Sequence, residues 1–393
     1  MTRTGKLLAE LIALPSVNPA FAPSPKGPAM AGAPRAGKFG EKNVADFLMA
    51  VAARAGLDVA VQPVIPADRR TGFPDRSNVL VRLAPRGPVR RTVLLAPHLD
   101  TVDAGDAGFI PRRVRDRMHG RGACDTKGCV AAMLTALCGL AHSKTRPQET
   151  EIVFAGLIDE EQGQAGSRAL VASGFKADLA IVGEPTRLQA VTAHKGSLWL
   201  ELETRGRAAH GATPQLGKNA VHEMARIVDV LETEYAAQLK KKRHPLLGAA
   251  TVNVGTICGG AQPNIVPAGC AIGIDRRTLP GETEASVRRE IAALLKSKKL
   301  NARFYNRKLA PALPMETSPR LPLIRDFMQS IGQTKPCGVH YFCDAAVLSA
   351  GGIPSLVFGP GDIAQAHTAD EWISLASLER GQQLLLRFLQ SLP

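Results

Sequence analysis

The chain has 393 residues, which is enough for two or three domains or for one large and one small domain. Hydrophobic residues make up 45% of the chain and the mean hydropathy is -0.02, values that describe an ordinary soluble globular protein. The formal net charge of +14 raises nucleic acid or a membrane surface as a partner, but aromatic residues make up only 4%, which argues against base stacking on a single strand.

The basic residues are spread along the chain, and the one dense run, KKKR at 240–243, is typical of a solvated helix end. Seven cysteines without CxxC spacing fit reduced thiols in a cytoplasm. The apolar stretch near the N-terminus is short and broken by Glu10, unlike a secretory signal, and no window reaches the roughly 18 apolar residues of a membrane span. We therefore expect a cytoplasmic protein that binds neither nucleic acid nor a membrane.

The first half of the chain predicts strands that alternate with helices. LLAELIAL has helical spacing, and the Pro/Ala/Gly-rich residues 19–40 predict a loop before the helical pattern EKNVADFLMAVAARAG. A strongly apolar helix is predicted for KGCVAAMLTALCGLAH. Four short apolar runs predict buried strands, namely TVLLAPH (92–98), EIVFAGLI (151–158), ADLAIVGE (177–184) and IPSLVFGP (353–360). This alternation predicts an α/β layer with a mostly parallel sheet and helices on both faces.

The pattern changes after residue 187. LWLELETRGR alternates apolar and polar residues, as a half-exposed antiparallel strand does. The helix NAVHEMARIVDVLETEYAAQL, the strands TVNVGTI and CAIGIDRRTL and the helix SVRREIAALLKS follow, before LPLIRDFM resumes the α/β pattern. We therefore predict an α/β domain over 1–187 and 309–393, interrupted at 188–308 by an α+β domain with two helices on a four-stranded antiparallel sheet.

Three of the four apolar runs lead into residues of the types that commonly bind metals in proteins. In chain order these residues are His98, Asp100, Asp159, Glu160, Glu161 and Glu184. In open α/β sheets, sites form in the crevice at the carboxyl ends of the strands. Two more candidates are Asp125, in the Gly-flanked turn GRGACDTKG, and His367, just past the last strand.

The candidate ligands are imidazoles and carboxylates without a thiolate, which favours Zn²⁺, Co²⁺ or Mn²⁺ over a structural cysteine–zinc site. Five protein ligands are too many for one tetrahedral ion with an open position, and they suit two ions about 3.5–4 Å apart. The five are His98, Asp125, Glu161, Glu184 and His367. Asp125 can bridge the ions with its two oxygens, and Asp100 can orient the imidazole of His98.

The acidic triplet 159–161 would repel itself unless it faces water or holds positive charge, and two cations would offset that repulsion. Adjacent strand residues face opposite ways, so one of Glu160 and Glu161 can bind metal while the other holds the reacting water as a general base. Each residue alone has a simpler interpretation: His98 and His367 as loop histidines, and Asp125 as a helix N-cap. Only the combination predicts a site.

Five motifs together resemble the dinuclear zinc amidohydrolase and exopeptidase family, which contains acetylornithine deacetylase, succinyl-diaminopimelate desuccinylase, carboxypeptidase G and aminoacylase. They are HLDTV (98–102), GRGACDTKG (120–128), DEE (159–161), GEPT (183–186) and AHTADE (366–371). The resemblance implies one zinc ion held by His98, Asp125 and Glu184, and another held by Asp125, Glu161 and His367. It also implies Glu160 as general base, Asp100 as the orienter of His98, and a homodimer formed through the inserted lid or dimerisation domain.

The inserted segment TRGRAAHGATPQLGKNA (204–220) resembles the family's signature around a histidine, here His210. The equivalent residue in the family reaches a neighbouring active site across the dimer and steadies the oxyanion. Asn264 and Arg277 resemble substrate-contacting residues, and an arginine can bind a carboxylate bidentately. Two departures from the family are Cys129, in place of a second glycine after DTKG, and the long segment 19–40.

The resemblance implies hydrolysis of the amide bond of an N-acylated amino acid or short peptide by a metal-activated water. Glu160 would accept the proton of that water and then protonate the departing amine. A dipeptidase or carboxypeptidase on the same scaffold is the alternative among enzymes. A non-catalytic polyanion-binding protein is the alternative from another class, and the intact set of ligands argues against it.

Overall fold

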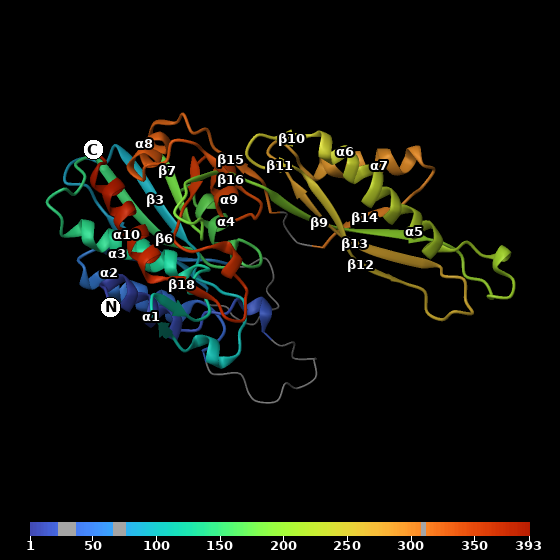
Figure 1. Cartoon of the computed structure of the whole chain (residues 1–393), viewed down its shortest axis with the longest axis horizontal. Helices are drawn as coiled ribbons and strands as arrows, with labels where there is room; N and C mark the ends of the chain where they lie inside the picture. Colours follow the sequence, from blue (N-terminus) through green and yellow to red (C-terminus); the bar gives the residue numbers. More distant parts are fainter. Residues whose placement is uncertain (23–36, 66–75, 308–311) are drawn as a thin grey trace. The chain divides into compact units, whose positions relative to one another are not determined.

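The computed structural model describes residues 1–22, 37–65, 76–307 and 312–393, which form two compact units (Figure 1). The first unit comprises Met1–Thr192, Thr317–Cys337 and Cys343–Pro393, and the second comprises Ala193–Glu316 and Gly338–Phe342. Each unit has its own cluster of buried apolar side chains. Most of the predicted loop at 19–40 lies outside the described residues.

A mixed sheet in the order β1-β2-β6-β3-β7-β17-β8 forms the centre of the first unit. The four strands β6, β3, β7 and β17 are parallel, whereas β1, β2 and β8 pair antiparallel with their neighbours. The predicted parallel sheet is therefore confirmed at its centre and gives way to antiparallel strands at the edges. The strands are β1 (Asp58–Pro63), β2 (Ser77–Leu83), β3 (Arg91–Pro97), β6 (Thr150–Gly156), β7 (Leu179–Gly183), β8 (Val191–His194) and β17 (Ser355–Val357).

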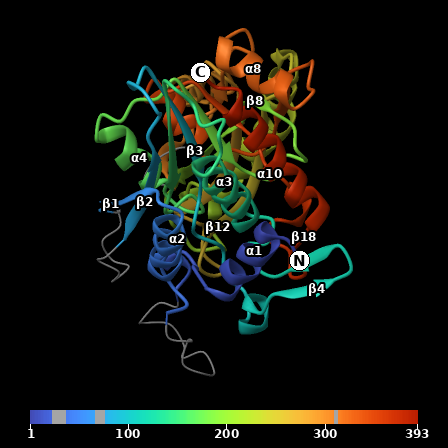
Figure 2. The same ribbon diagram turned by 90° about the vertical axis from the view of Figure 1, so that its left-hand side faces the viewer.

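Helices cover this sheet on both sides. The helix α3 packs against β3, β6 and β7, and α1 and α10 pack on α3. Because α3 is covered on all sides, almost every residue of it is buried, which explains why its sequence is apolar all round. Figure 2 shows α4 on the side of the strands opposite to α3. The helices are α1 (Arg3–Ala13), α2 (Lys42–Arg54), α3 (Lys127–Ala141), α4 (Ala165–Ala172), α8 (Pro322–Ser330), α9 (Ala345–Ala350) and α10 (Leu375–Gln390).

A small three-stranded sheet in the first unit joins segments that are far apart in the sequence. Its order is β18-β5-β4, and β18 pairs antiparallel with β5 so that Trp372 lies opposite His119. The pairing brings the motif AHTADE, just before β18, beside the turn GRGACDTKG, just after β5. The strands are β4 (Arg112–Val114), β5 (Arg117–His119) and β18 (Trp372–Ser374).

The second unit is built on a separate antiparallel sheet, which the sequence predicts, and the order of its strands is β12-β13-β9-β14. The long helix predicted after β9 is present as α5 and α6, joined by a π-helical turn at Leu231–Tyr235. The helices are α5 (Ala220–Val230), α6 (Ala236–Lys241) and α7 (Glu284–Ser297). The strands of this sheet are β9 (Gly196–Arg205), β12 (Thr251–Gly259), β13 (Gly269–Thr278) and β14 (Arg303–Asn306). The strands β10 (Arg243–His244) and β11 (Gly248–Ala249) pair with each other, whereas β15 (Met315–Glu316) and β16 (Cys337–Val339) pair with β8.

The sequence predicts reduced thiols and no helix that spans a membrane. All seven cysteines are free. Across the parts of the chain that the structure describes, every helix is too short or too polar to cross a lipid bilayer.

Candidate metal centre

Three parallel strands of the first unit end at one edge of the sheet. β3 lies between β6 and β7, and the register pairs Pro97 with Gly183 and His98 with Leu157. The residues that follow the three strands therefore begin at the same level. This arrangement brings together His98 after β3, the acidic triplet after β6 and Glu184 after β7, at the carboxyl edge where α/β sheets form their sites.

Asp125 lies between the two histidines of this edge. Its Oδ1 atom is 3.1 Å from Nε2 of His98, and its Oδ2 atom is 3.3 Å from Nε2 of His367. Asp125 comes from the turn before α3, whereas His367 comes from the loop after β17, where its backbone φ is 61°. A carboxylate that directs one oxygen toward each imidazole has the arrangement that a bridging ligand needs.

Each histidine also has a second carboxylate. Nε2 of His98 lies 3.9 Å from Oε1 of Glu184, and Nε2 of His367 lies 3.1 Å from Oε2 of Glu161. Ligand atoms at about 2.1 Å from one tetrahedral ion lie roughly 3.4 Å apart, so both separations suit ligands of a common ion. The side chains thus form two sets, one around each imidazole, with Asp125 common to both.

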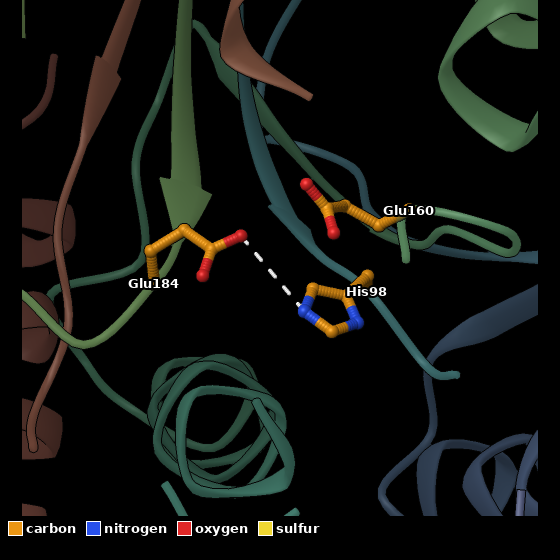
Figure 3. A group of neighbouring side chains, drawn as sticks. All are labelled: His98, Glu160 and Glu184. Carbon is orange, nitrogen blue, oxygen red and sulfur yellow. Dashed lines mark ion pairs between the residues drawn. The ribbon is translucent and has the colours of Figure 1, made fainter. Parts of the chain in front are cut away.

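Glu160 extends into the same space from the side opposite to Glu184 (Figure 3). Ligand atoms of Glu160, Glu184 and His98 all lie within 4.8 Å of one another. Burial, and then the charge of Glu184, raise the pKa of Glu160 well above the usual range of a carboxyl group. A buried carboxyl group at this place can exchange a proton with a bound molecule or add a ligand to a cation.

The site holds more negative than positive charge. Burial raises the pKa of Glu184 well above its usual range, and burial together with the charge of Asp125 raises the pKa of Glu161. Hydrogen bonds to Asp125 and Glu161 raise the pKa of His367 to about 10. Four carboxylates and two imidazoles without a thiolate are the donor set of Zn²⁺, Co²⁺ or Mn²⁺, so the residues fit divalent cations.

Asp100 has a wider role in the structure than the orientation of His98. Nδ1 of His98 lies 2.9 Å from the backbone oxygen of Asp100 and 3.5 Å from its Oδ1 atom. The carboxylate accepts hydrogen bonds from the backbone N–H groups of Glu160 and Glu161, each at 3.1 Å, and from Nδ2 of Asn18 at 2.7 Å. Asp100 therefore fixes the backbone of the loop that carries Glu160 and Glu161.

A buried charge network continues from Asn18, and the sequence gives little sign of it. Nδ2 of Asn18 also donates to Oδ1 of Asp159 at 3.0 Å, and Nη1 of Arg76 lies 3.0 Å from the same oxygen. The guanidinium of Arg76 is held in turn by both carboxylate oxygens of Glu41. Asp159 has a left-handed backbone φ of 69°, a conformation that residues other than glycine rarely adopt without support. The network supplies that support at the start of the acidic triplet.

Three further predicted residues lie in the second unit. His210 and Asn264 are exposed and belong to neighbouring loops, since the N–H of Gly211 donates to the backbone oxygen of Asn264 at 2.7 Å. Nδ1 of His210 accepts from the N–H of Ala212 at 3.1 Å. Arg277 lies on β13, where its Nε donates to Oδ2 of Asp275 at 3.0 Å. The structure thus brings His210 and Asn264 together in that unit, with Arg277 on its sheet.

Cys129, which departs from the resembled family, is completely buried in the first turn of α3. Burial and the charge of Glu184 raise the pKa of its thiol well above the usual range. Cys129 belongs to neither of the two groups of described residues whose ligand atoms lie within 4.8 Å of one another. An added Cβ at Gly359 would lie 2.4 Å from its Sγ atom, so the thiol fills a tightly packed position.

Comparison with known proteins agrees with the motifs. The family model described as Peptidase family M20/M25/M40 matches residues 94–391. An acetylornithine deacetylase from Myxococcus xanthus is 30% identical over 324 residues, which cover 80% of this chain and 83% of the relative.

Two solved structures share the fold. An M20 family metallo-carboxypeptidase from Sulfolobus solfataricus is 18% identical with a TM-score of 0.74, covering 99% of both chains. An aminopeptidase from Bacillus cereus is 20% identical with a TM-score of 0.74, covering 99% of this chain and 97% of that one. The resemblance identified from the motifs is confirmed, and so is the prediction of a metal-dependent hydrolase.

Proposed function

Because the chain belongs to Peptidase family M20/M25/M40, we propose that it hydrolyses the amide bond of an N-acylated amino acid at a site with two divalent cations. The observation that carries the proposal is the position of Asp125, with one carboxylate oxygen 3.1 Å from His98 and the other 3.3 Å from His367. His98, Asp125 and Glu184 would hold one cation. Asp125, Glu161 and His367 would hold the other.

When bound, such cations supply Lewis acidity and make water a nucleophile near neutral pH. Glu160 accepts the proton of the attacking water and later donates it to the nitrogen of the leaving amine, a role that its position beside His98 and Glu184 allows. Asp100 holds the backbone of Glu160, so that the carboxyl group keeps its place through both proton transfers. Glu160→Ala should lower kcat by at least about 100-fold with metal content unchanged. Near-normal turnover in this variant would remove Glu160 from the role.

The names of the relatives support the proposed substrate class. The named deacetylase at 30% identity favours an N-acyl amino acid, and the named carboxypeptidase and aminopeptidase with the same fold favour a short peptide as the alternative. In this proposal Arg277 and Asn264 bind the carboxylate end of the substrate, and His210 stabilises the oxyanion in a homodimer formed through the second unit. The enzyme would act in the cytoplasm, with zinc as the physiological metal.

A substrate panel tests the proposal. The protein is stripped with a chelator, reloaded with Zn²⁺, Co²⁺ or Mn²⁺, and assayed against N-acetylornithine, N-succinyl-diaminopimelate, other N-acyl amino acids and dipeptides. We expect metal-dependent release of the free amine from an N-acyl amino acid and two bound ions per chain. Hydrolysis of dipeptides alone would favour the peptidase alternative. A reloaded protein that binds fewer than two ions and cleaves none of these amides would refute both.

A further inference from the structure

The last residue of the motif AHTADE, Glu371, makes an unusual number of contacts for a residue outside the predicted ligand set. Its side chain is 2% exposed. Oε1 accepts hydrogen bonds from the backbone N–H groups of Cys124 at 2.8 Å and Asp125 at 3.0 Å, and Oε2 accepts one from Gly122 at 2.9 Å. A single buried carboxylate thus binds three amides of the turn that carries the shared ligand Asp125.

The same carboxylate is tied to the loop of the second histidine. Nη1 of Arg121 lies 2.7 Å from Oε2 of Glu371, and Nη2 of Arg121 donates to the backbone oxygen of Thr368 at 3.1 Å. Thr368 directly follows His367, whose side chain is 53% exposed and lies on a loop. Glu371 and Arg121 therefore connect the turn before α3 to the chain beside His367.

The small sheet of the first unit explains why this connection is possible. β18 begins directly after Glu371 and pairs with β5, which ends directly before the turn, and the N–H of Gly120 donates to the backbone oxygen of Glu371 at 3.0 Å. The strand pairing fixes the backbone of Glu371 next to the turn. Its side chain then reaches the amides on either side of Ala123.

We propose that Glu371, acting with Arg121, is a positioning residue that sets the distance between Asp125 and His367 and thereby the affinity for the cation that these two ligands share. The inference rests on the proposed function, since it assumes that Asp125, Glu161 and His367 bind one cation. Substitution of a residue that orients metal ligands typically lowers metal affinity about 10–100-fold.

The variant Glu371→Gln tests the positioning role with little change in size. Gln keeps one acceptor oxygen, but its NH₂ group must face either the amides of Cys124 and Asp125 or the amide of Gly122 and the guanidinium of Arg121, all of which are donors. The matched control is Asp370→Asn, the same chemical change in the preceding residue, whose side chain is 75% exposed.

The experiment titrates zinc ions alone into the stripped full-length protein by competition with a chromophoric chelator. His367→Ala identifies which binding step depends on His367. We expect Glu371→Gln to weaken that step at least about 10-fold and more than the other step, while Asp370→Asn leaves both unchanged. Arg121→Met keeps the three hydrogen bonds from backbone N–H groups to Glu371 but loses the hydrogen bond to Thr368, so it should weaken the His367-dependent step alone. This variant provides the test if Glu371→Gln fails to fold.

The outcomes separate this inference from the proposed function. If the unmodified protein shows fewer than two zinc-binding steps, the proposed function fails. If it shows two steps and both are unchanged in Glu371→Gln and Arg121→Met, or both weaken equally, only the positioning role is overturned.

Discussion

Replacement of Asp100 by Asn is the sharpest test of how the site is held, because it changes one buried atom. The carboxylate is 0% exposed and receives two backbone amides and the side chain of Asn18. If the amide oxygen of Asn takes the place of Oδ2, its NH₂ group faces the N–H of Glu160, and if it takes the place of Oδ1, the NH₂ group faces both Glu161 and Asn18. At least one buried donor loses its acceptor in either orientation.

The sign and size of the effect follow from the electrostatics. Burial alone would raise the pKa of Asp100, but its bonds with His98 and Asn18 and the charge of Arg76 lower it below the usual value. The folded state therefore favours the ionised form, and loss of that charge destabilises the fold even though other carboxylates lie nearby. A lost hydrogen bond to a charged group and an unsatisfied amide together cost about 3 kcal/mol.

Urea unfolding of the stripped protein measures this loss, and zinc titration and kinetics measure its effect on the site. We expect Asp100→Asn to lower the free energy of unfolding by about 3 kcal/mol, metal affinity about 10–100-fold and kcat by a similar factor. Asp103→Asn is the control, since Asp103 is 44% exposed and its salt bridge with Lys38 is worth under about 1 kcal/mol. Equal stability of the two variants would contradict the view that Asp100 supports the loop of Glu160.

Two other predictions concern buried ionisable groups. Arg76→Met leaves the carboxylates of Glu41 and Asp159 without their cation and should lower the free energy of unfolding by about 3–5 kcal/mol, as measured by urea unfolding. The double variant with Glu41→Gln should regain part of this loss. If the losses of the two single variants simply add in the double variant, the pairing of Arg76 with Glu41 is disproved. Burial lowers the pKa of His194 to about 4, so the unfolded chain binds more protons than the folded one between about pH 6.5 and pH 4. Stability should fall by about 3 kcal/mol as the pH drops through that window, less so in His194→Asn, and identical acid slopes for the two proteins would exclude His194 as the cause.

The sequence singles out the candidate ligands of this site but not the residues that hold them. His98 and Glu184 end buried apolar runs, so their position at a strand end is a local property of the sequence, and the parallel pairing of the strands places them at one edge. The supporting bonds are not local. Arg76 is 83 residues from Asp159, and Glu371 is 246 residues from Asp125. No periodicity or motif signals such pairs, because each depends on which loops the fold brings together.

Two features of the fold are also not predicted from the sequence. β1 lies at the edge of the sheet and is largely exposed, so the apolar runs that identify the parallel centre have no counterpart there. The long helix of the second unit contains a π-helical turn at Leu231–Tyr235, whose first and last residues are both buried. Asp100 shows the limit for side chains, since its spacing from His98 suggests contact with the imidazole but not that its carboxylate also receives two backbone amides of another loop.

Asp100 and Glu371 use the same physical device on two different loops. Each is a buried carboxylate that accepts backbone amides from a segment carrying a candidate ligand, and neither belongs to the ligand set. Loops at strand ends are the least constrained parts of an α/β fold, yet metal affinity depends on ligand placement within about 0.5 Å. Carboxylates that bind the loop backbone remove this freedom before any cation arrives. Substitution of either carboxylate should therefore reduce the stability of the stripped protein as well as its metal affinity, whereas His367→Ala should reduce metal affinity far more than stability.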